Sequence, residues 1–446
     1  MKSSGNSHRI AIIGCGTVGG ATAKQVINNE KTLNKRSGLD IQLKYIVDKD
    51  FTNAKRLGLP EKLYETSIDK AISDQEVDII IELIGGKTFA KQVIEQAIDA
   101  GKAVVTANKA LLATDGPELM ERALKNNTVI AFEASCAGGI PIVRALYDGL
   151  VANSIEAMYG IVNGTCNFIL SEMVQKGQTF SEALGEAQAT GLAEADPTLD
   201  ISGEDSAHKL AILGSLAFGQ KMDFDSIPVE GINKLELMDL EVGSELGYII
   251  KLLAIAKKTD NGISLFVRPV FIHKDHPLAW VSGSFNAISV YGDTVGHTMY
   301  YGRGAGGAPT ASAIVSDIVS TAQGTLQERF KNMGIWPDRT EQAKQLPSGE
   351  NIGRFYIRMI AHDQPGVLAG AASILAKHNI SISSVLQKEP EHTESGNNGV
   401  PVVITTHIGK EGNVRNALQE IDNQPYILEK SVCIHIVDEH EENLPD

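Results

Sequence analysis

The 446-residue sequence has only four cysteines, Cys15, Cys136, Cys166 and Cys433, and no two of them form a CxxC pair. A disulfide framework or a structural zinc site needs closely patterned cysteines, so both are excluded as the basis of the fold. Scattered cysteines are typical of reduced thiols, and we therefore expect a cytoplasmic protein.

Basic residues are also in short supply. The sequence has 40 Lys and Arg residues against 55 Asp and Glu residues, which gives a formal net charge of −15. Binding to nucleic acid or to an anionic membrane needs a basic field, so we expect neither partner. No apolar run approaches the length of a membrane span. The expected partners are small molecules, whose binding depends on local charge.

Glycine is abundant, and three glycines near the N-terminus form a GxGxxG motif. The apolar stretch Arg9–Ile13 predicts a strand that runs into Gly14, Gly16 and Gly19 and then into a helix over Ala21–Asn29. A strand, a glycine turn and a helix in this order predict a dinucleotide-binding fold. There the first glycine permits the turn, the second lets the backbone approach a pyrophosphate, and the third lets the helix pack on the strand.

The residues after the next strand bear on the choice of cofactor. Leu43–Val47 predicts a strand that ends in Asp48, where such folds place an acid that binds the ribose hydroxyls of NAD. Lys49, Lys55 and Arg56 follow, and their charges favour the 2′-phosphate of NADP. We expect NADP, because three cations accompany one relevant acid, and NAD remains the alternative.

Strands and helices continue to alternate through the first third of the chain. Val77–Gly86 and Val104–Lys109 contain apolar strands, and Phe89–Ala100 between them is amphipathic. This alternation predicts a parallel sheet covered on both faces, with ligands at the carboxyl ends of its strands. Asn108 and Lys109 stand at one such end, and we expect Lys109 to project toward the nicotinamide.

The segment Gly191–Leu210 carries several carboxylates, a His and a Lys, and runs directly into an apolar helix. This combination predicts a polar site mounted on a packed support. Asp205 and Lys209 lie one helical turn apart, so their side chains project from the same face. The alternative is an ordinary surface ion pair.

Three further segments carry candidate ligands or loops. Glu133 is followed by small residues and glycines, a pattern that suits a cage of carbonyl oxygens around a hard cation or, alternatively, a hinge between domains. Asn163, Thr165 and Asn167 lie at a strand-to-helix turn, where they would bind substrate or cap the helix. Tyr300–Thr310 predicts a flexible glycine loop before a helix that returns to the first domain.

Together these segments resemble homoserine dehydrogenase. The resemblance covers nearly all of residues 9–322, in the family's order and approximate spacing, and it rests on Gly14–Gly19, Val105–Lys109, Phe132–Pro141, Asn163–Phe168 and Gly191–Lys209. It implies an enzyme that reversibly reduces L-aspartate 4-semialdehyde to L-homoserine with NAD(P)H, in threonine and methionine biosynthesis.

The resemblance also implies roles in catalysis. Lys209 corresponds to the family's proton donor, and Asp205 and Lys109 to its close partners. Glu194 and Asp200 fall where the family holds the charged amino end of the substrate. The chemistry agrees, because hydride transfer to an aldehyde develops negative charge on oxygen, which a nearby ammonium group stabilises and protonates.

Cofactor, substrate and cation contacts follow from the same resemblance. Beside the three glycines, the expected cofactor contacts are Thr17, Val18, Asp48, Lys49, Arg56, Lys109, Gly191 and Gly306. Thr165 is an expected substrate contact. Sodium or another monovalent cation is expected at Glu133 together with the carbonyl oxygens of Cys136, Gly138 and Ile140.

The last quarter of the chain has the pattern of a separate small domain. The expected βαββαβ elements are Arg354–Ala361, Val367–His378, Ile380–Leu386, Val400–Ile408, Val414–Ile421 and Tyr426–Val437. The turn Asp363–Gly366 resembles that of an ACT domain, so we expect an amino-acid effector at Asp363 and Gly366, with threonine as the downstream product. The alternative is a dimerisation or stabilising module that binds nothing. A polar loop is expected over Gln387–Asn398.

The expected architecture is α/β with three domains. A Rossmann-type parallel-sheet domain spans 1–135, with a return helix at about 308–325, and an α+β catalytic and dimerisation domain spans 136–307. A linker at 326–350 leads to a ferredoxin-like βαββαβ (ACT) domain at 351–446. We expect a homodimer or homotetramer. We expect no fused aspartate kinase, because no kinase-like segment precedes the glycine motif.

Two other functions fit parts of the sequence. A phosphorylating semialdehyde dehydrogenase would use Cys136 or Cys166 as a thiol nucleophile, but no His is adjacent to either cysteine in the sequence. A non-catalytic sensor of NADP and an amino acid would need no proton donor such as Lys209.

Overall fold

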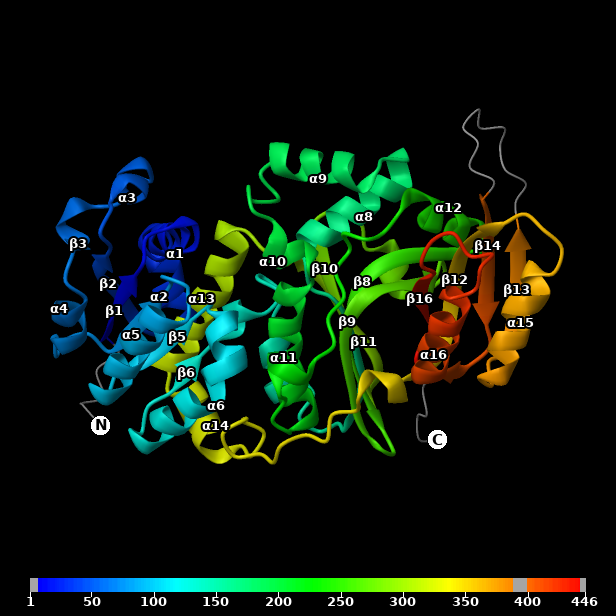
Figure 1. Ribbon diagram of the computed structural model, residues 1–446. Coiled ribbons are helices and arrows are strands. Elements are labelled where there is room, and N and C mark those ends of the chain that lie inside the picture. The colour runs from blue at the N-terminus through cyan, green and yellow to red at the C-terminus, as the bar shows by residue number, and fades with distance from the viewer. Residues whose placement is uncertain (1–6, 388–398, 442–446) are drawn as a thin grey trace.

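The computed structural model describes residues 7–387 and 399–441. Figure 1 shows three parts in a row, with the blue and cyan N-terminal part at one end, the green middle part between, and the orange and red C-terminal part at the other end. The expected α/β class is confirmed, because helices accompany both a parallel and a mixed sheet. Of the loop expected over Gln387–Asn398, Gln387 belongs to the strand Ile382–Gln387, and residues 388–398 lie outside the described residues.

The N-terminal part is a parallel six-stranded sheet in the order β3-β2-β1-β4-β5-β6. The strand order reverses between β1 and β4, and ligands bind in such a crevice at the carboxyl ends of the strands. Its elements are β1 (Ser7–Ile13), α1 (Thr17–Asn28), α2 (Glu30–Ser37), β2 (Asp40–Val47), α3 (Thr52–Arg56), β3 (Tyr64–Glu65), α4 (Ile68–Ser73), β4 (Ile79–Glu82), α5 (Thr88–Asp99), β5 (Ala103–Thr106), α6 (Lys109–Lys125) and β6 (Ile130–Ala131).

The middle part is an antiparallel sheet in the order β11-β10-β7-β8-β9, with helices against it. The apolar half of α11 packs on β7, β8 and β9, which fixes the helix whose first turn carries the charged residues. Its elements are α7 (Ile142–Arg144), β7 (Ile155–Ile161), α8 (Gly164–Lys176), α9 (Phe180–Ala189), α10 (Thr198–Ile201), α11 (Glu204–Phe218), α12 (Leu237–Glu245), β8 (Tyr248–Thr259), β9 (Gly262–His273), β10 (Phe285–Gly292) and β11 (Gly296–Arg303).

The chain then returns to the nucleotide domain. Helix α13 (Gly307–Ala322) packs against α1, as expected for a return helix. The glycine loop expected over 300–310 is shorter than predicted, because β11 pairs with β10 as far as Arg303. Only residues 304–306 separate β11 from α13.

The connector 326–350 runs along the other two domains. The side chains of Phe330, in α14 (Thr325–Asn332), and of Trp336, just after this helix, are buried. Farther on, Ile263 donates its amide to the carbonyl of Lys344, and Leu346 donates to the carbonyl of Ile263. The connector is therefore packed and hydrogen-bonded against the middle domain.

The C-terminal part has the expected βαββαβ order, with its strands arranged β16-β12-β14-β13. Its elements are β12 (Ile352–His362), α15 (Val367–Lys377), β13 (Ile382–Gln387), β14 (Gly399–Thr406), β15 (Gly409–Lys410), α16 (Glu411–Asp422) and β16 (Val432–Val437). The last strand begins six residues later than predicted. No described helix is long and apolar enough to cross a bilayer.

One feature of the sheet was not predicted. Strand β16 pairs in parallel with β9, with His435 opposite Val270 and Val437 opposite Ile272. The sheets of the middle and C-terminal domains therefore form one ten-stranded sheet, which Figure 1 shows running through the right half of the molecule.

Candidate active site

Glycines shape the turn between β1 and α1. A Cβ atom at Gly14 would lie 2.6 Å from the carbonyl oxygen of Leu83, and one at Gly19 would lie 1.9 Å from the carbonyl oxygen of Gly14. At Gly16, no atom of the described chain lies within 4 Å of that position. The turn is thus tightly packed at its two ends and open in the middle, which suits the approach of a pyrophosphate.

Two helices begin side by side next to this turn. Helices α1 and α13 have glycine N-caps, Gly16 and Gly306, which offer no side chain to the free N–H groups. A Cβ atom at Gly307 would lie 3.2 Å from the carbonyl oxygen of Thr17. Two adjacent N-termini with free N–H groups form a favourable environment for phosphate. Val18 is half-buried in the first turn of α1.

At the adenosine end, the side chain of Asp48 faces the glycine turn. Its carboxylate accepts hydrogen bonds from the backbone amide of Cys15 at 2.5 Å and from that of Lys49 at 2.7 Å. Lys49, Lys55 and Arg56 are exposed beside it. The acid therefore braces the turn, and the neighbouring cations are exposed, with Arg56 donating to the Asn53 side chain at 2.8 Å.

A cluster of charges joins the nucleotide domain to the middle domain. Lys209 donates from Nζ to Asp205 Oδ2 at 2.6 Å and to the carbonyl oxygen of Val162 at 2.6 Å. Lys109, the first residue of α6, lies with Nζ 3.1 Å from Asp205 Oδ1. The Lys109 side chain is 31% exposed, whereas that of Lys209 is 10% exposed. The expected trio is therefore assembled from two domains around one buried carboxylate.

The electrostatics of the cluster keep it charged. Burial raises the pKa of Asp205, but the two nearby ammonium groups outweigh burial and hold this pKa well below its usual range. Burial likewise lowers the pKa of Lys109, and attraction to Asp205 outweighs it, so the net shift is upward. Asp205 consequently stays ionised between its two lysines at neutral pH.

Asn163 and Asp200 complete this cluster. Asn163 donates from Nδ2 to Asp200 Oδ1 at 2.8 Å and to Asp205 Oδ2 at 2.9 Å, and its Oδ1 caps α8 by accepting from the amide of Cys166. The strand-to-helix turn thus supplies both a cap and a contact to the charges. Asn163 was expected to bind substrate or cap the helix, and the cap is present. Its contacts with the two aspartates, and that of the Val162 carbonyl with Lys209, were not predicted, since these partners lie more than 35 residues away in the sequence.

Other predicted residues lie apart from this cluster. Thr165 donates its hydroxyl hydrogen to the carbonyl of Leu192, and Asn167 donates to carbonyls of the loop that includes Val281 and Gly283. The side chain of Asn167 is 2% exposed and anchors this loop instead of facing Asp205. Glu194 is exposed and Gly191 adopts φ +72° in the exposed loop before it.

The segment expected to hold a cation is buried at the domain boundary. The Glu133 carboxylate accepts from the amides of Val143 at 3.0 Å and Arg144 at 2.8 Å, so it faces the start of α7. Burial and the nearby Asp317 raise the pKa of Glu133 to about 8. Among described residues, no group of three His, Cys, Asp or Glu side chains could hold a metal ion. A cation here would therefore depend on backbone oxygens.

The two middle cysteines are poor nucleophiles. Both are fully buried, and burial raises the pKa of the Cys136 thiol to about 12 and that of the Cys166 thiol well above its ordinary value. The Cys166 thiol donates to the carbonyl of Asp200. A nucleophile needs a low pKa or an adjacent base, so the geometry argues against thiol chemistry at either position.

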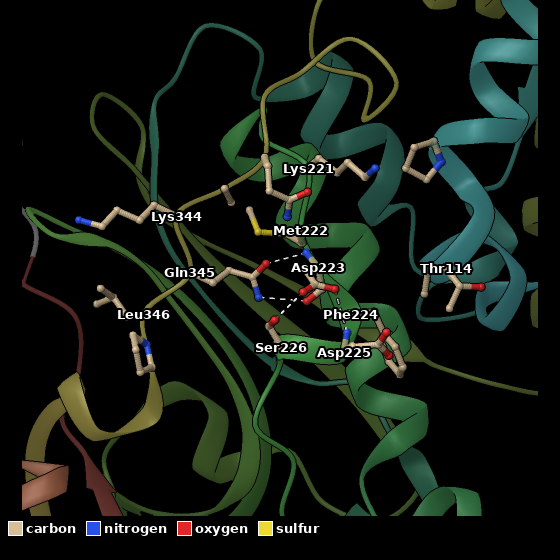
Figure 2. Close-up of a pocket in the computed structure, with 15 residues that line it drawn as sticks. Thr114, Lys221, Met222, Asp223, Phe224, Asp225, Ser226, Lys344, Gln345 and Leu346 are labelled. Atoms are coloured by element: carbon tan, nitrogen blue, oxygen red, sulfur yellow. Dashed lines mark hydrogen bonds between the residues drawn. The ribbon is translucent and has the colours of Figure 1, made fainter.

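A cavity of about 690 Å³ lies between α6, residues 221–226 and the connector (Figure 2). Asp223 donates its amide to the side-chain oxygen of Gln345 at 2.6 Å, and Gln345 returns a bond to the Asp223 carbonyl. Ser226 also donates to the Asp223 carboxylate. The lysines of the charged cluster do not line this cavity, whose hydrogen bonds tie the connector to the middle domain.

Comparison with known proteins identifies the family of this chain. Three family models match: the homoserine dehydrogenase NAD-binding domain at 14–133, homoserine dehydrogenase at 141–319, and the ACT domain at 355–425. The homoserine dehydrogenase of Neisseria gonorrhoeae is 41% identical over 416 residues, which are 93% of this chain and 94% of that protein. The Helicobacter pylori enzyme is 42% identical over 96% of this chain and 98% of its own length.

Solved structures give the same result. The crystal structure of a homoserine dehydrogenase from Thiobacillus denitrificans superposes with a TM-score of 0.90 at 41% identity, covering 97% of this chain and 98% of that one. A hyperthermophilic archaeal homoserine dehydrogenase in complex with NADPH superposes with a TM-score of 0.60 at 26% identity, covering 71% and 98% of the two chains.

A Rossmann-type sheet joined to a lysine–aspartate cluster and matched by these proteins defines an NAD(P)-dependent oxidoreductase that acts on a CH–OH group. More specifically, the chain belongs to the homoserine dehydrogenase family and carries a C-terminal ACT domain.

Proposed function

We propose that this protein reversibly reduces L-aspartate 4-semialdehyde to L-homoserine with NADPH, in threonine and methionine biosynthesis in the cytoplasm. The observation that carries the proposal is the contact of Lys109 and Lys209 with one buried carboxylate, Asp205, at the boundary with the nucleotide domain. The experiment is the initial rate of homoserine-dependent reduction of NADP and of NAD. Absence of turnover with both, from folded protein, would refute the reaction.

In this mechanism Lys209 donates the proton. When bound, the nicotinamide supplies hydride to the aldehyde carbon. Two of the three ammonium hydrogens of Lys209 are held by Asp205 and the Val162 carbonyl, which leaves the third for the substrate oxygen. Lys109 adds positive charge where the oxyanion develops, and Asp205 holds both lysines. In the reverse direction Lys209 accepts the proton. Lys209→Ala should remove nearly all turnover.

Substrate binding is proposed at the carboxylates of Asp200 and Glu194. Asp200 would take the ammonium group, with Glu194 reaching it from the exposed loop and Thr165 offering its hydroxyl oxygen as an acceptor. Glu194→Gln should raise the KM for homoserine with little change in kcat, because it removes binding that is common to the ground and transition states.

NADP is the proposed cofactor. Gly14, Gly16, Thr17, Val18 and Gly19 would contact it at the turn, Gly191 and Gly306 would meet it from the middle domain, and Lys49 and Arg56 would hold the 2′-phosphate. The support is that Asp48 is already occupied by backbone amides, whereas the cations are exposed. Arg56→Gln should raise the KM for NADP about tenfold, the loss of one charge-assisted hydrogen bond, and leave that for NAD unchanged. An equal rise for both would contradict the assignment.

We further propose a monovalent cation, sodium or a similar ion, held by backbone oxygens of Glu133, Cys136, Gly138 and Ile140. The fit is partial: the Ile140 carbonyl already accepts from Ile142, while Ala137 and Gly138 both adopt positive φ. Carbonyl and carboxylate oxygens are the ligands that hard cations prefer. Melting temperatures in sodium chloride and in choline chloride at equal ionic strength test the site; identical values would refute it.

For the ACT domain we propose feedback inhibition by threonine at the turn that contains Asp363 and Gly366. The turn is exposed, and Gly366 adopts φ +95° as the N-cap of α15. The pairing of β16 with β9 favours a second candidate function, a stabilising module without ligand. Equilibrium dialysis with threonine separates the two, because the absence of saturable binding would leave only the stabilising role.

Assembly as a homodimer or homotetramer is proposed through the middle domain. Strand β11 is an edge strand, and its Tyr301 side chain is 55% exposed, while nearby in the sequence Trp280 is 79% exposed. Exposed aromatic residues of this kind are enriched at protein interfaces. Light scattering after gel filtration should give a mass of two or four chains, and a monomer would contradict the proposal.

A further inference from the structure

The side chain of Asn163 contacts Asp200 and Asp205, two of the three carboxylates of the proposed site. Asn163 is the N-cap of α8, two residues after the end of β7, and it is 5% exposed. Its neighbour Val162 supplies the carbonyl that holds Lys209. This short turn therefore contacts the proton donor and both acids at once.

The orientation of the Asn163 amide is set by chemistry. The backbone amide of Cys166 can only donate, so the atom facing it at 2.8 Å must be Oδ1. The two hydrogens of Nδ2 must then point the other way, to Asp200 Oδ1 at 2.8 Å and Asp205 Oδ2 at 2.9 Å. All three polar positions of this buried amide are in use, so its rotation would break several bonds at once.

The two carboxylates differ in what else they contact. Asp205 uses both oxygens on the lysines and Asn163, whereas Asp200 Oδ2 has no hydrogen-bond partner within residues 7–387 and 399–441. Asp200 and Asp205 share the side-chain nitrogen of Asn163, and without this donor between them the two carboxylates would repel each other. The groups that face the amide are Asp200 on α10, Asp205 and Lys209 on α11, Lys109 on α6 and the Cys166 thiol on α8.

We propose that Asn163 is a positioning residue that separates the roles of the two acids, holding Asp205 on the lysines and turning the free oxygen of Asp200 toward the substrate ammonium group. This inference rests on the proposed function. A neutral donor at this position allows both acids to stay ionised, one for the proton donor and one for the substrate.

Three variants test it. Asn163→Ser keeps a helix cap but loses the bridge, and Asn163→Asp keeps the shape and the cap but replaces the donor by a third carboxylate. Thr179→Ala is the control, because it removes the capping residue of α9, which lies outside the charged cluster. All three are compared with the wild type for the pH profile of kcat/KM with homoserine and for melting temperature.

Asn163→Ser should raise the KM for homoserine and lower kcat, each about tenfold, because a charge-assisted hydrogen bond to each acid is lost. Asn163→Asp should shift the acid limb of kcat/KM upward by about one pH unit or more, since an added negative charge favours protonation of its neighbours. Thr179→Ala should move neither limb. The proposal would be overturned if the acid limb of kcat/KM in Asn163→Asp lay at the wild-type pH. It would also be overturned if Asn163→Ser lowered the melting temperature without changing KM or kcat.

A second measurement needs no substrate, so it separates this inference from the reaction itself. The deficit in melting temperature of Asn163→Asp relative to the wild type should grow from pH 4 to pH 8, as three neighbouring carboxylates become ionised. A deficit that does not change with pH would overturn the bridging role even if the wild type turns over homoserine. A growing deficit in a protein without turnover would support the bridge and refute the proposed function.

Discussion

Two buried aspartates lie at the two domain boundaries, and they differ in their cationic partners. Asp205 faces two lysines, one from the nucleotide domain, and the Lys109 side chain is 31% exposed. Asp239 on α12 faces Arg358 on β12 of the ACT domain; Asp239 is 0% exposed and Arg358 is 3% exposed. The same pairing of charges therefore occurs once at an open boundary and once at a closed one.

The chemistry of the cations explains the difference. Lysine has three movable donors and exchanges its proton, so it suits a site where charge must be transferred. Arginine does not deprotonate in proteins, and its planar group holds a carboxylate with two parallel bonds, here at 2.7 and 3.0 Å. Tyr356 donates a third bond to Asp239 at 3.0 Å. The lysines of the first boundary suit the proposed proton transfer, and the arginine of the second suits attachment of the ACT domain.

The largest expected effect is the loss of proton transfer at the open boundary. Lys209→Arg keeps the positive charge beside Asp205 but cannot release a proton, so kcat should fall about 10³-fold, within the range for general acid catalysis. Steady-state kinetics with homoserine and NADP measure it, and a urea titration establishes that the variant is folded. If more than a tenth of the wild-type kcat remained, Lys209 would not be the proton donor.

The opposite substitution, arginine to lysine, at the boundary with the ACT domain should lower stability. Arg358→Lys loses one of two parallel bonds and leaves part of Asp239 unpaired in the interior, which should lower the free energy of unfolding by about 2–3 kcal/mol. The kcat of folded enzyme should stay within twofold. Arg122→Lys is the matched control, since Arg122 holds Asp99 in the same two-bond geometry but its side chain is 37% exposed. Equal losses in both variants would show that burial is not decisive.

The pH dependence of the ACT boundary gives a third prediction. His435 on β16 stacks between Phe266 and Phe355, and burial, with a smaller effect of Arg268, lowers its pKa to about 4, while Glu411 acts in the opposite direction. Between pH 4 and the ordinary histidine pKa of about 6.5, the unfolded chain binds the proton more readily. Stability is therefore complete above about pH 6.5 and is lost as the pH falls toward 4.

At pH 4 the lost free energy should amount to about 3 kcal/mol, because the pKa of His435 is about 6.5 in the unfolded chain and about 4 in the folded protein. Urea titrations at pH 4, 5, 6 and 7 measure it. His435→Gln removes the titrating group, and its stability should decline less over this range. His273→Gln, on the exposed end of β9, is the control, and it should reproduce the wild-type decline. An identical decline in His435→Gln would contradict the assignment.

Whether the sequence predicts a contact depends on how far apart the two residues lie along the chain. The glycine turn and the βαββαβ order were predicted, because a strand, its turn and the following helix are adjacent in sequence and have distinct periods. Asp205 and Lys209 were predicted to meet because they are four residues apart on one helix. The placement of Lys109 beside them followed from family resemblance, and its Nζ lies 3.1 Å from Asp205 Oδ1.

Contacts between distant segments were not predicted. Arg358 and Asp239 are separated by 119 residues, and β16 meets β9 at a sheet edge that no hydrophobic period marks. The contacts of the Glu133 carboxylate with the amides at the start of α7 were not predicted either. In each case the outcome depends on which backbone groups and charges remain unpaired after the domains pack.

The smallest expected effect concerns the second acid near Arg358. Glu236 lies 2.9 Å from the same guanidinium group, but its side chain is 56% exposed, whereas Asp239 is fully buried. Water screens an exposed pair, so Glu236→Gln should lower the free energy of unfolding by no more than about 0.5 kcal/mol. Asp239→Asn should cost several times more, because it leaves a buried cation without its charge partner. Urea titrations of the two variants at low salt and at about 0.5 M salt compare the two losses of free energy directly. Equal losses of unfolding free energy would mean that either acid near Arg358 can hold it. Burial of Asp239 would then not be what fixes the ACT domain to the middle sheet.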